Sequence, residues 1–236
     1  ISEPQVRSNS KTLSFSYDDE LPVLRDISLK IAAGEKLAVV GPTGSGKSTL
    51  IRLLGRFYNF QRGTIFLDGV DLLDLDSKDL RQRVGVVMQD FHIFSGSILD
   101  NITLGNPSIS DEQGIEAACA VNAHSFIESL PEGYQTQLVE RGQNLSQGQR
   151  QLLAFARVLA ANPEILVLDE ATASIDTETE EIIQNALKII MKGRTSILIA
   201  HRLKTIQEAD RILVLKNGRV KEIGTHDQLM ANKDVY

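Results

Sequence analysis

The chain has 236 residues, 42% of them hydrophobic and 24% charged, with 17 glycines, one cysteine and no tryptophan. This composition is close to the average for globular domains, so it excludes collagen-like, low-complexity and wholly disordered chains, and the length predicts one large α/β domain or a core with a lobe. The 31 acidic and 25 basic residues give a net charge of −6 without a long run of Lys and Arg, which argues against nucleic acid as a partner.

The N-terminal part of the chain predicts antiparallel β structure. Apolar residues alternate with serines over 13–17, a period of two that is typical of a half-buried strand. A second alternation of apolar residues, over 27–31, follows an acidic turn at 18–20. Two such strands joined by a turn predict a small antiparallel sheet.

Three short, continuous apolar runs predict a different kind of strand. They are LAVV at 37–40, ILVL at 165–168 and SILIA at 196–200. Runs without alternation are typical of parallel strands that helices cover on both faces. The expected fold class is therefore α/β, with a mostly parallel central sheet and an N-terminal antiparallel β subdomain.

Three capping-box pairs, in which Ser or Thr precedes Glu or Gln by three positions, predict helix starts. The pairs, each followed by the helix that it opens, are Ser110 with Gln113 before 111–121, Thr177 with Glu180 before 178–191, and Thr225 with Gln228 before 226–232. The segment 111–143 is mainly helical, so we expect a helical lobe over about 90–160 within a single domain spanning 1–236. Near the end of the chain, Asn217 and Gly218 predict a type I′ hairpin turn.

Cys119 lies in the first of these helices among small apolar residues, which predicts a buried thiol. A single cysteine forms no internal disulfide and is typical of a reducing compartment. No apolar run reaches the roughly 18 residues of a membrane span, and no signal-peptide pattern opens the chain. Because the chain begins at Ile1 and ends at Tyr236 without a terminal tail, we expect a soluble piece of a longer protein.

Residues 41–48 read GPTGSGKS, a full match to the phosphate-loop pattern G-x-x-x-x-G-K-[ST]. The match lies between an apolar strand run and a helix with apolar residues from Leu50 to Phe57, which is the context that the motif requires. Backbone N–H groups from Gly44 to Thr49 would hold phosphates, Lys47 would add a positive charge, and the Ser48 hydroxyl would bind Mg²⁺. An ordinary glycine-rich turn is the structural alternative. The nucleotide-binding residues expected here are Gly41, Thr43, Gly44, Ser45, Gly46, Lys47, Ser48 and Thr49.

Asp169 and Glu170 follow an apolar strand run directly. At the carboxyl end of a strand they would face the crevice in which α/β sheets bind ligands. Asp169 is then the expected Mg²⁺ ligand, and Glu170 the general base that acts on the attacking water. A pair of solvated charges at a strand end is the alternative interpretation, and the presence of a phosphate loop in the same sequence argues against it.

Residues 145–149 read LSQGQ and lead into an amphipathic helix whose N-terminus is a small anion site. With this segment the sequence resembles the nucleotide-binding domain of the ATP-binding cassette (ABC) family, whose signature is LSGGQ. The order of motifs matches over nearly the whole chain: phosphate loop, Gln89, signature, acidic pair, ASID at 173–176 and His201. A complete ordered set is far more specific than any one motif. The resemblance implies an ATPase that uses ATP and Mg²⁺, built on a P-loop NTPase core with a helical signature lobe.

The resemblance also implies roles for residues that the motifs alone do not assign. Tyr17 matches the aromatic residue that stacks on adenine, and a plain strand aromatic paired with Phe15 is the alternative. Gln89 matches the glutamine that contacts Mg²⁺ and the attacking water, and His201 matches the switch histidine at the γ-phosphate. The expected catalytic residues are Glu170, His201, Gln89 and Lys47, and the expected metal ligands are Ser48, Gln89 and Asp169.

In the resembling family, two such domains face each other head to tail around two ATP molecules. Ser146 and Gly148 would then contact the γ-phosphate of the ATP in the opposite phosphate loop. Asp176 matches the loop aspartate that crosses to the other domain. The expected partner is thus a second nucleotide-binding domain.

Two further segments resemble those of exporters: VERG at 139–142 and GTHDQLMA at 224–231. The resemblance implies a transmembrane domain fused ahead of residue 1 and a motor at the cytoplasmic face of a membrane. FHIF at 91–94 would form part of the groove that receives an intracellular coupling helix of the transmembrane domain, and a core turn is the alternative. The transported substrate stays open, because transmembrane helices select it.

Gln147 departs from the family pattern, which has glycine at this position. A side chain here would crowd the opposite γ-phosphate, which favours an asymmetric heterodimer, and a homodimer that tolerates Gln147 is the alternative.

An ATPase clamp on nucleic acid or ribosomes is the alternative function, and the sequence lacks the heptad insertion, second cassette or basic face of such proteins. Intact Glu170 and His201 argue against a binding-only cassette, and a P-loop kinase would leave LSQGQ and ASID without a role.

Overall fold

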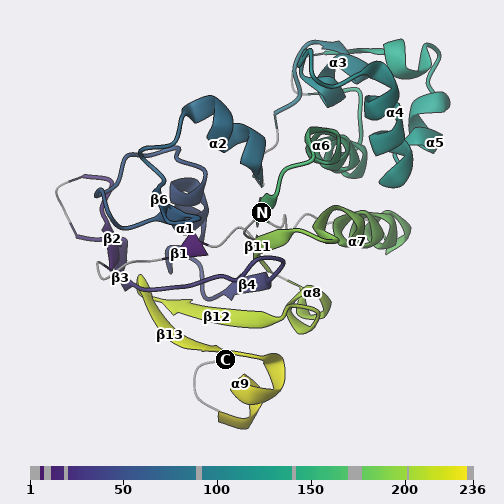
Figure 1. Ribbon diagram of the computed structural model, residues 1–236. Coiled ribbons are helices and arrows are strands. Elements are labelled where there is room, and N and C mark those ends of the chain that lie inside the picture. Colours follow the sequence, from purple (N-terminus) through teal and green to yellow (C-terminus); the bar gives the residue numbers. More distant parts are fainter. Residues whose placement is uncertain are drawn as a thin grey trace. The chain divides into compact units, whose positions relative to one another are not determined.

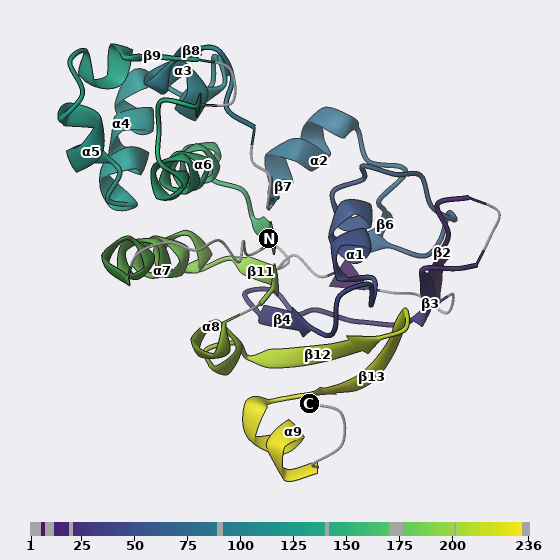
Figure 2. The ribbon, with the colours of Figure 1, turned by 180° about the vertical axis from the view of Figure 1, so that it is seen from behind.

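The computed structural model describes residues 6–7, 12–18, 21–88, 92–139, 142–169, 177–200 and 202–232. The chain divides into two compact units. The first comprises 1–86, 164–171 and 193–236, and the second comprises 87–163 and 172–192. Figures 1 and 2 show the strands of the first unit and the helices of the second from opposite sides. No helix of the described ranges has the length and apolar character that a membrane span requires.

A six-stranded sheet forms the centre of the first unit, in the order β13-β12-β4-β11-β10-β7. Its strands are β4 (Lys36–Val40), β7 (Val84–Val87), β10 (Ile165–Asp169), β11 (Thr195–Ile199), β12 (Arg211–Lys216) and β13 (Arg219–Gly224). The pairs β10–β11, β11–β4 and β4–β12 are parallel, and every residue of β10 and β11 is buried. The three apolar runs therefore form neighbouring parallel strands, as predicted, because only a strand covered on both faces lacks alternation.

The C-terminal segments also follow the sequence prediction. Asn217 and Gly218 both have positive φ, 53° and 74°, which a type I′ turn between antiparallel strands requires. Thr225 and Gln228 exchange backbone and side-chain hydrogen bonds at the start of α9 (His226–Asn232). The short helix α8 (Leu203–Gln207) lies between β11 and β12 in the sequence.

The predicted N-terminal antiparallel pair is present, but the second strand lies earlier than expected. β2 (Leu13–Phe15) pairs with β3 (Leu24–Ile27), so the alternation over 27–31 is not a strand. Asp26 has a φ of 52°, and this left-handed residue breaks the period of two. Leu24 and Ile27 are consequently both buried although they are three positions apart. A second small sheet contains β1 (Val6–Arg7), β5 (Phe66–Leu67) and β6 (Val70–Asp71).

The helix after the phosphate loop is shorter than its apolar residues predicted. α1 (Lys47–Leu54) ends at Leu54, Gly55 is its C-cap, and the next residue, Arg56, has a φ of 53°. Phe57 therefore lies outside the helix, with 58% of its surface exposed. A second helix of this unit, α2 (Ser77–Arg83), has Asp76 as its N-cap, and the Asp76 carboxylate accepts a hydrogen bond from the Lys78 backbone N–H.

The second unit is mainly helical (Figure 2). Its elements are β8 (Gly96–Ser97), α3 (Ile98–Thr103), α4 (Asp111–Ala120), α5 (His124–Glu128), a 3₁₀ turn (Gly133–Gln135), β9 (Gln137–Leu138), α6 (Gln147–Ala161) and α7 (Thr177–Met191). α6 packs against α3, α4 and α7 and buries Leu153 and Ala156 completely. The capping box of Ser110 and Gln113 is formed as predicted, and α7 begins at Thr177, one position before the predicted start at residue 178.

The prediction of a buried thiol at Cys119 was wrong. Cys119 is exposed, whereas Ala117 and Ala118 beside it are buried. On a helix only one face meets the core, so small apolar neighbours in the sequence do not place a residue on that face.

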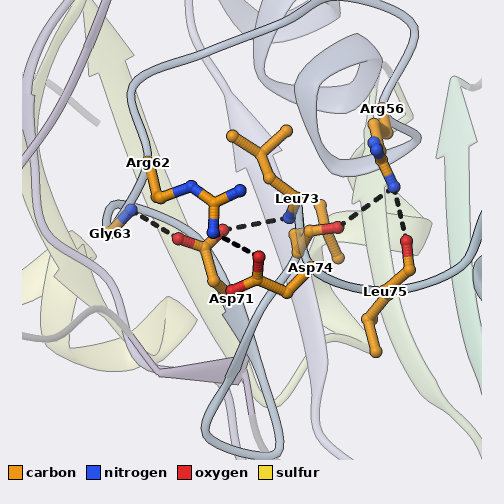
Figure 3. Close-up of polar contacts among 8 residues, drawn as sticks. Arg56, Arg62, Gly63, Asp71, Leu73, Asp74 and Leu75 are labelled. Atoms are coloured by element: carbon orange, nitrogen blue, oxygen red, sulfur yellow. Dashed lines mark hydrogen bonds and ion pairs between the residues drawn. The ribbon is translucent and has the colours of Figure 1, made fainter.

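A buried carboxylate ties the segment after α1 to the small sheet (Figure 3). The two oxygens of Asp71 accept hydrogen bonds from the backbone N–H groups of Gly63, at 2.5 Å, and Leu73, at 3.0 Å. Arg56 donates to the backbone carbonyl of Leu75 at 2.7 Å. These contacts fix the course of the chain between α1 and α2.

We predict that Asp71→Ala lowers the free energy of unfolding by about 3 kcal/mol, because it leaves two N–H groups without an acceptor. Asp71→Asn keeps one oxygen acceptor and should lose about half as much. The matched control is Asp74→Ala, which removes only an exposed ion pair with Arg62 and should lose less than about 1 kcal/mol. Urea unfolding curves measure all three, and equal losses for Asp71→Ala and Asp74→Ala would contradict this account.

Candidate functional site

The phosphate loop connects β4 to α1, and two of its glycines have no room for a side chain. Gly41 has a φ of 152°, and a Cβ atom there would lie 2.0 Å from the carbonyl oxygen of Leu215. Gly46 has a φ of 103°, and a Cβ atom there would lie 2.7 Å from Leu24 Cδ2. The loop therefore fits closely against β3 and β12, and only glycine allows that approach.

The turn between β12 and β13 forms a backbone hydrogen bond with the phosphate loop. The Gly218 N–H donates to the Ser45 carbonyl at 3.0 Å, and the Gly218 carbonyl accepts from the Arg25 N–H at 2.8 Å. The sequence predicted the turn but not this contact, because nothing in the Asn-Gly dipeptide shows what the turn packs against. Segments about 170 residues apart in the chain thus hold the phosphate loop in one conformation.

Lys47 places a largely buried ammonium group at this loop. Its Nζ donates to the carbonyls of Gly41 at 2.8 Å and Pro42 at 3.0 Å, which accounts for two of its three N–H donors. Burial lowers the pKa of Lys47, and the nearby Asp169 carboxylate acts in the opposite direction. A cation in such surroundings is well suited to an anionic ligand, which would compensate its lost hydration.

Ser45 adds an unsatisfied hydroxyl to the same loop. Within the part of the chain that the structure describes, its buried Oγ has no hydrogen-bond partner. Buried polar atoms are normally paired, so an unpaired one at a loop of this sequence indicates a place for a ligand oxygen. Both observations, at Lys47 and at Ser45, fit a phosphate group.

Ser48 and Asp169 present the oxygen donors that Mg²⁺ prefers. Ser48 is exposed on the first turn of α1, and Asp169 ends β10. β4 and β10 are both parallel to β11, which lies between them, so their carboxyl ends share one edge of the sheet. This edge is where α/β sheets bind ligands.

Tyr17 lies just after β2 and keeps 42% of its surface exposed. Its ring meets the Phe15 ring edge-on at 5.1 Å, so the pairing with Phe15 that the sequence left as an alternative does exist. The Tyr17 hydroxyl also lies 2.9 Å from the Thr49 hydroxyl on the first turn of α1. Sequence reasoning assigned Thr49 only a backbone role and missed this link.

The segment LSQGQ opens α6 with a complete capping box. Ser146 Oγ accepts from the Gln149 N–H at 3.2 Å, and Gln149 Oε1 accepts from the Ser146 N–H at 2.9 Å. Gln147 is exposed, whereas Gly148 is buried. A Cβ atom at Gly148 would lie 2.3 Å from Thr179 Cγ2 on α7. Close packing of α6 against α7 therefore favours glycine at this position, in addition to the contact with ATP expected from the sequence.

Arg157 of α6 holds the segment that contains the predicted coupling groove. It donates to the carbonyls of Asn101, at 2.9 Å, and His92, at 3.0 Å, and its guanidinium lies 5.7 Å from the centre of the Phe94 ring. Burial lowers the pKa of Arg157 to about 10. Ile93 is fully buried, but 49% of Phe94 is exposed, so this segment has one core residue and one surface ring.

Four predicted site residues lie outside the described residues: Gln89, Glu170, Asp176 and His201. Glu170 comes directly after β10, and His201 comes two positions after the end of β11. Their roles stay predictions, as do the contacts predicted for Ser146 and Gly148.

Comparisons with known proteins identify the family of this chain. The ABC transporter family model matches residues 24–173. The chain is 54% identical to the ABC transporter ATP-binding protein YknV of Bacillus subtilis, over 95% of this chain and 37% of that protein. It is 48% identical to a protein of Staphylococcus aureus named as a multidrug export ATP-binding/permease protein, over 98% of this chain and 40% of that one. A solved structure of a bacterial Atm1-family ABC exporter with ATP bound superposes with a TM-score of 0.90 at 41% identity, over 100% of this chain and 41% of that chain.

The chain thus spans about two fifths of the length of these relatives. The family match covers more than half of the chain, and the sheet order and phosphate loop agree with it. The chain belongs to the ABC transporter family and is one of its nucleotide-binding domains.

Proposed function

We propose that this domain is the ATP-hydrolysing motor of an exporter, and that it binds Mg²⁺ together with ATP. The observation that carries the proposal is the phosphate loop, in which Lys47 is buried and the buried Ser45 hydroxyl has no partner among the described residues. The relatives named as exporters favour transport over a clamp on nucleic acid, and the net charge of −6 agrees with that preference.

In this proposal the loop binds the triphosphate through backbone N–H groups, Lys47 and the Ser45 hydroxyl. Ser48, Asp169 and Gln89 would hold Mg²⁺, which when bound neutralises charge that develops on the phosphates. Tyr17 would stack on the adenine ring.

Hydrolysis requires a group that takes a proton from the attacking water. Glu170 is that general base in the proposal, because it directly follows in the sequence Asp169, the last residue of β10 and the proposed metal ligand. The oxygen of that water bonds to the terminal phosphorus while the bond to the bridging oxygen of ADP breaks, so the products are ADP and phosphate. Gln89 would orient the water, and His201 would contact the terminal phosphate.

The partners proposed are a second nucleotide-binding domain and the coupling helices of a transmembrane domain, at the cytoplasmic face of a membrane. Ser146, Gly148 and Asp176 would complete the opposite ATP site. Gln147 is exposed at the N-terminus of α6, so its side chain would lie at that contact. This position supports a heterodimer with one altered site, and a homodimer that tolerates Gln147 is the second candidate.

We predict that Lys47→Ala raises the Kd for ATP at least about a hundredfold, because it removes a charge that several phosphate oxygens would share. The matched control is Lys78→Ala, which removes the same charge from an exposed position on α2. Titration calorimetry with MgATP measures both variants. An unchanged Kd for Lys47→Ala would refute the phosphate-loop assignment.

We predict that Glu170→Gln slows hydrolysis by about 10² to 10⁴ while the affinity for ATP stays nearly the same, since the amide keeps the shape but cannot accept the proton. Asp169→Asn should instead weaken Mg²⁺-dependent binding and hydrolysis together. Single-turnover hydrolysis and ATP binding are measured on the same preparation. A parallel loss of affinity in Glu170→Gln would show that Glu170 supports the structure of the site rather than the chemistry.

A further inference from the structure

Three aromatic rings from two distant segments meet next to α1. Phe15 ends β2, Tyr17 follows it, and Tyr58 lies four residues beyond the end of α1. The Tyr17 and Tyr58 rings are edge-on, with centroids 5.0 Å apart and planes at 82°. Phe15 meets Tyr17 in the same manner, and it lies 6.1 Å from Tyr58. We call these three residues the aromatic cluster.

The three rings differ in burial. Phe15 is 9% exposed, whereas Tyr58 is 39% and Tyr17 is 42% exposed. Phe15 therefore anchors the cluster in the core, and the other two rings reach the surface. Edge-on pairs at these distances are attractive, so each ring restrains its neighbours.

Tyr17 is restrained at a second point by its hydroxyl. The 2.9 Å hydrogen bond to Thr49 ties the far end of the ring to the helix that begins with Lys47. Thr49 is buried and cannot follow a mobile tyrosine. The ring of Tyr17 is thus held at its hydroxyl and by two rings, although much of it is exposed.

Order before binding has a consequence for affinity. A side chain that is mobile in the free protein loses its rotamer freedom when a base stacks on it, which weakens binding by about three- to tenfold. A ring that is already held avoids this loss. The restraint affects the affinity only for ligands that contact the ring. It should therefore strengthen the binding of a nucleotide but not the binding of a phosphate chain that has no base.

We propose that Tyr58 is a positioning residue of the nucleotide site, which holds the Tyr17 ring ready for the base without contacting the nucleotide itself. The inference rests on the proposed function, in which Tyr17 stacks on adenine. Tyr58 acts through the ring contact, so phenylalanine at this position keeps the effect and leucine removes it.

The test compares Tyr58→Leu and Tyr58→Phe, each alone and combined with Tyr17→Ala. Titration calorimetry measures the Kd for ATP and for tripolyphosphate, which has no base. We expect Tyr58→Leu to raise the Kd for ATP about three- to tenfold, Tyr58→Phe to leave it near the wild-type value, and neither to change the Kd for tripolyphosphate. With Tyr17→Ala present, Tyr58→Leu should have no further effect.

A second measurement needs no nucleotide. Because the chain has no tryptophan, Tyr17→Trp introduces a single tryptophan at the position of the proposed stacking ring, and excitation at the red edge of its absorption band avoids the tyrosines. Adding Tyr58→Leu should lower the fluorescence anisotropy of this tryptophan, and adding Tyr58→Phe should not. Tyr58→Met replaces Tyr58→Leu in both measurements if the leucine variant unfolds.

Several outcomes would overturn the proposal. An unchanged Kd for ATP in Tyr58→Leu, an equal loss for tripolyphosphate, a further loss in the Tyr17→Ala background or an unchanged anisotropy each contradicts a positioning role. Failure of the proposed function looks different, because the wild-type domain would then bind neither ATP nor tripolyphosphate.

Discussion

Burial of the Lys47 ammonium group is the constraint on which the rest of the site depends. Removing a charge from water is unfavourable, and here two backbone carbonyls and a nearby carboxylate offset part of that loss. Those carbonyls belong to Gly41 and Pro42, so the loop must curl around the lysine. A triphosphate would supply the opposite charge that the loop itself lacks. The atoms that determine the conformation of the loop are therefore also those proposed to bind the ligand.

The curled loop needs support from outside, and the fold brings it from both ends of the chain. Leu24 of β3 and Leu215 of β12 leave no room for side chains at Gly46 and Gly41, and Gly218 donates to the loop carbonyl of Ser45. The aromatic cluster and Thr49 restrain the Tyr17 ring, on which adenine is proposed to stack, in the same way. A site that is formed before its ligand arrives loses little entropy on binding.

The sequence predicted those parts of the fold that local chemistry decides. Continuous apolar runs identified β4, β10 and β11, and paired Ser–Gln or Thr–Gln side chains marked the starts of α4 and α9. Predictions failed where one residue adopts a left-handed backbone, as Asp26 does in β3 and Arg56 does after α1, because nothing in the residue type requires it. The exposed Cys119, the Gly218–Ser45 contact and the role of Thr49 depend on tertiary packing, which motifs do not contain.

The central claim is that residues 41–49 hold the triphosphate of ATP. Amide hydrogen exchange, followed by mass spectrometry with and without MgATP, tests it most directly, because the claim concerns the backbone N–H groups of one segment. The account predicts slower exchange over 41–49 when ATP binds, with little change over the exposed helix α2. Bound ATP with unchanged exchange over 41–49 would contradict it.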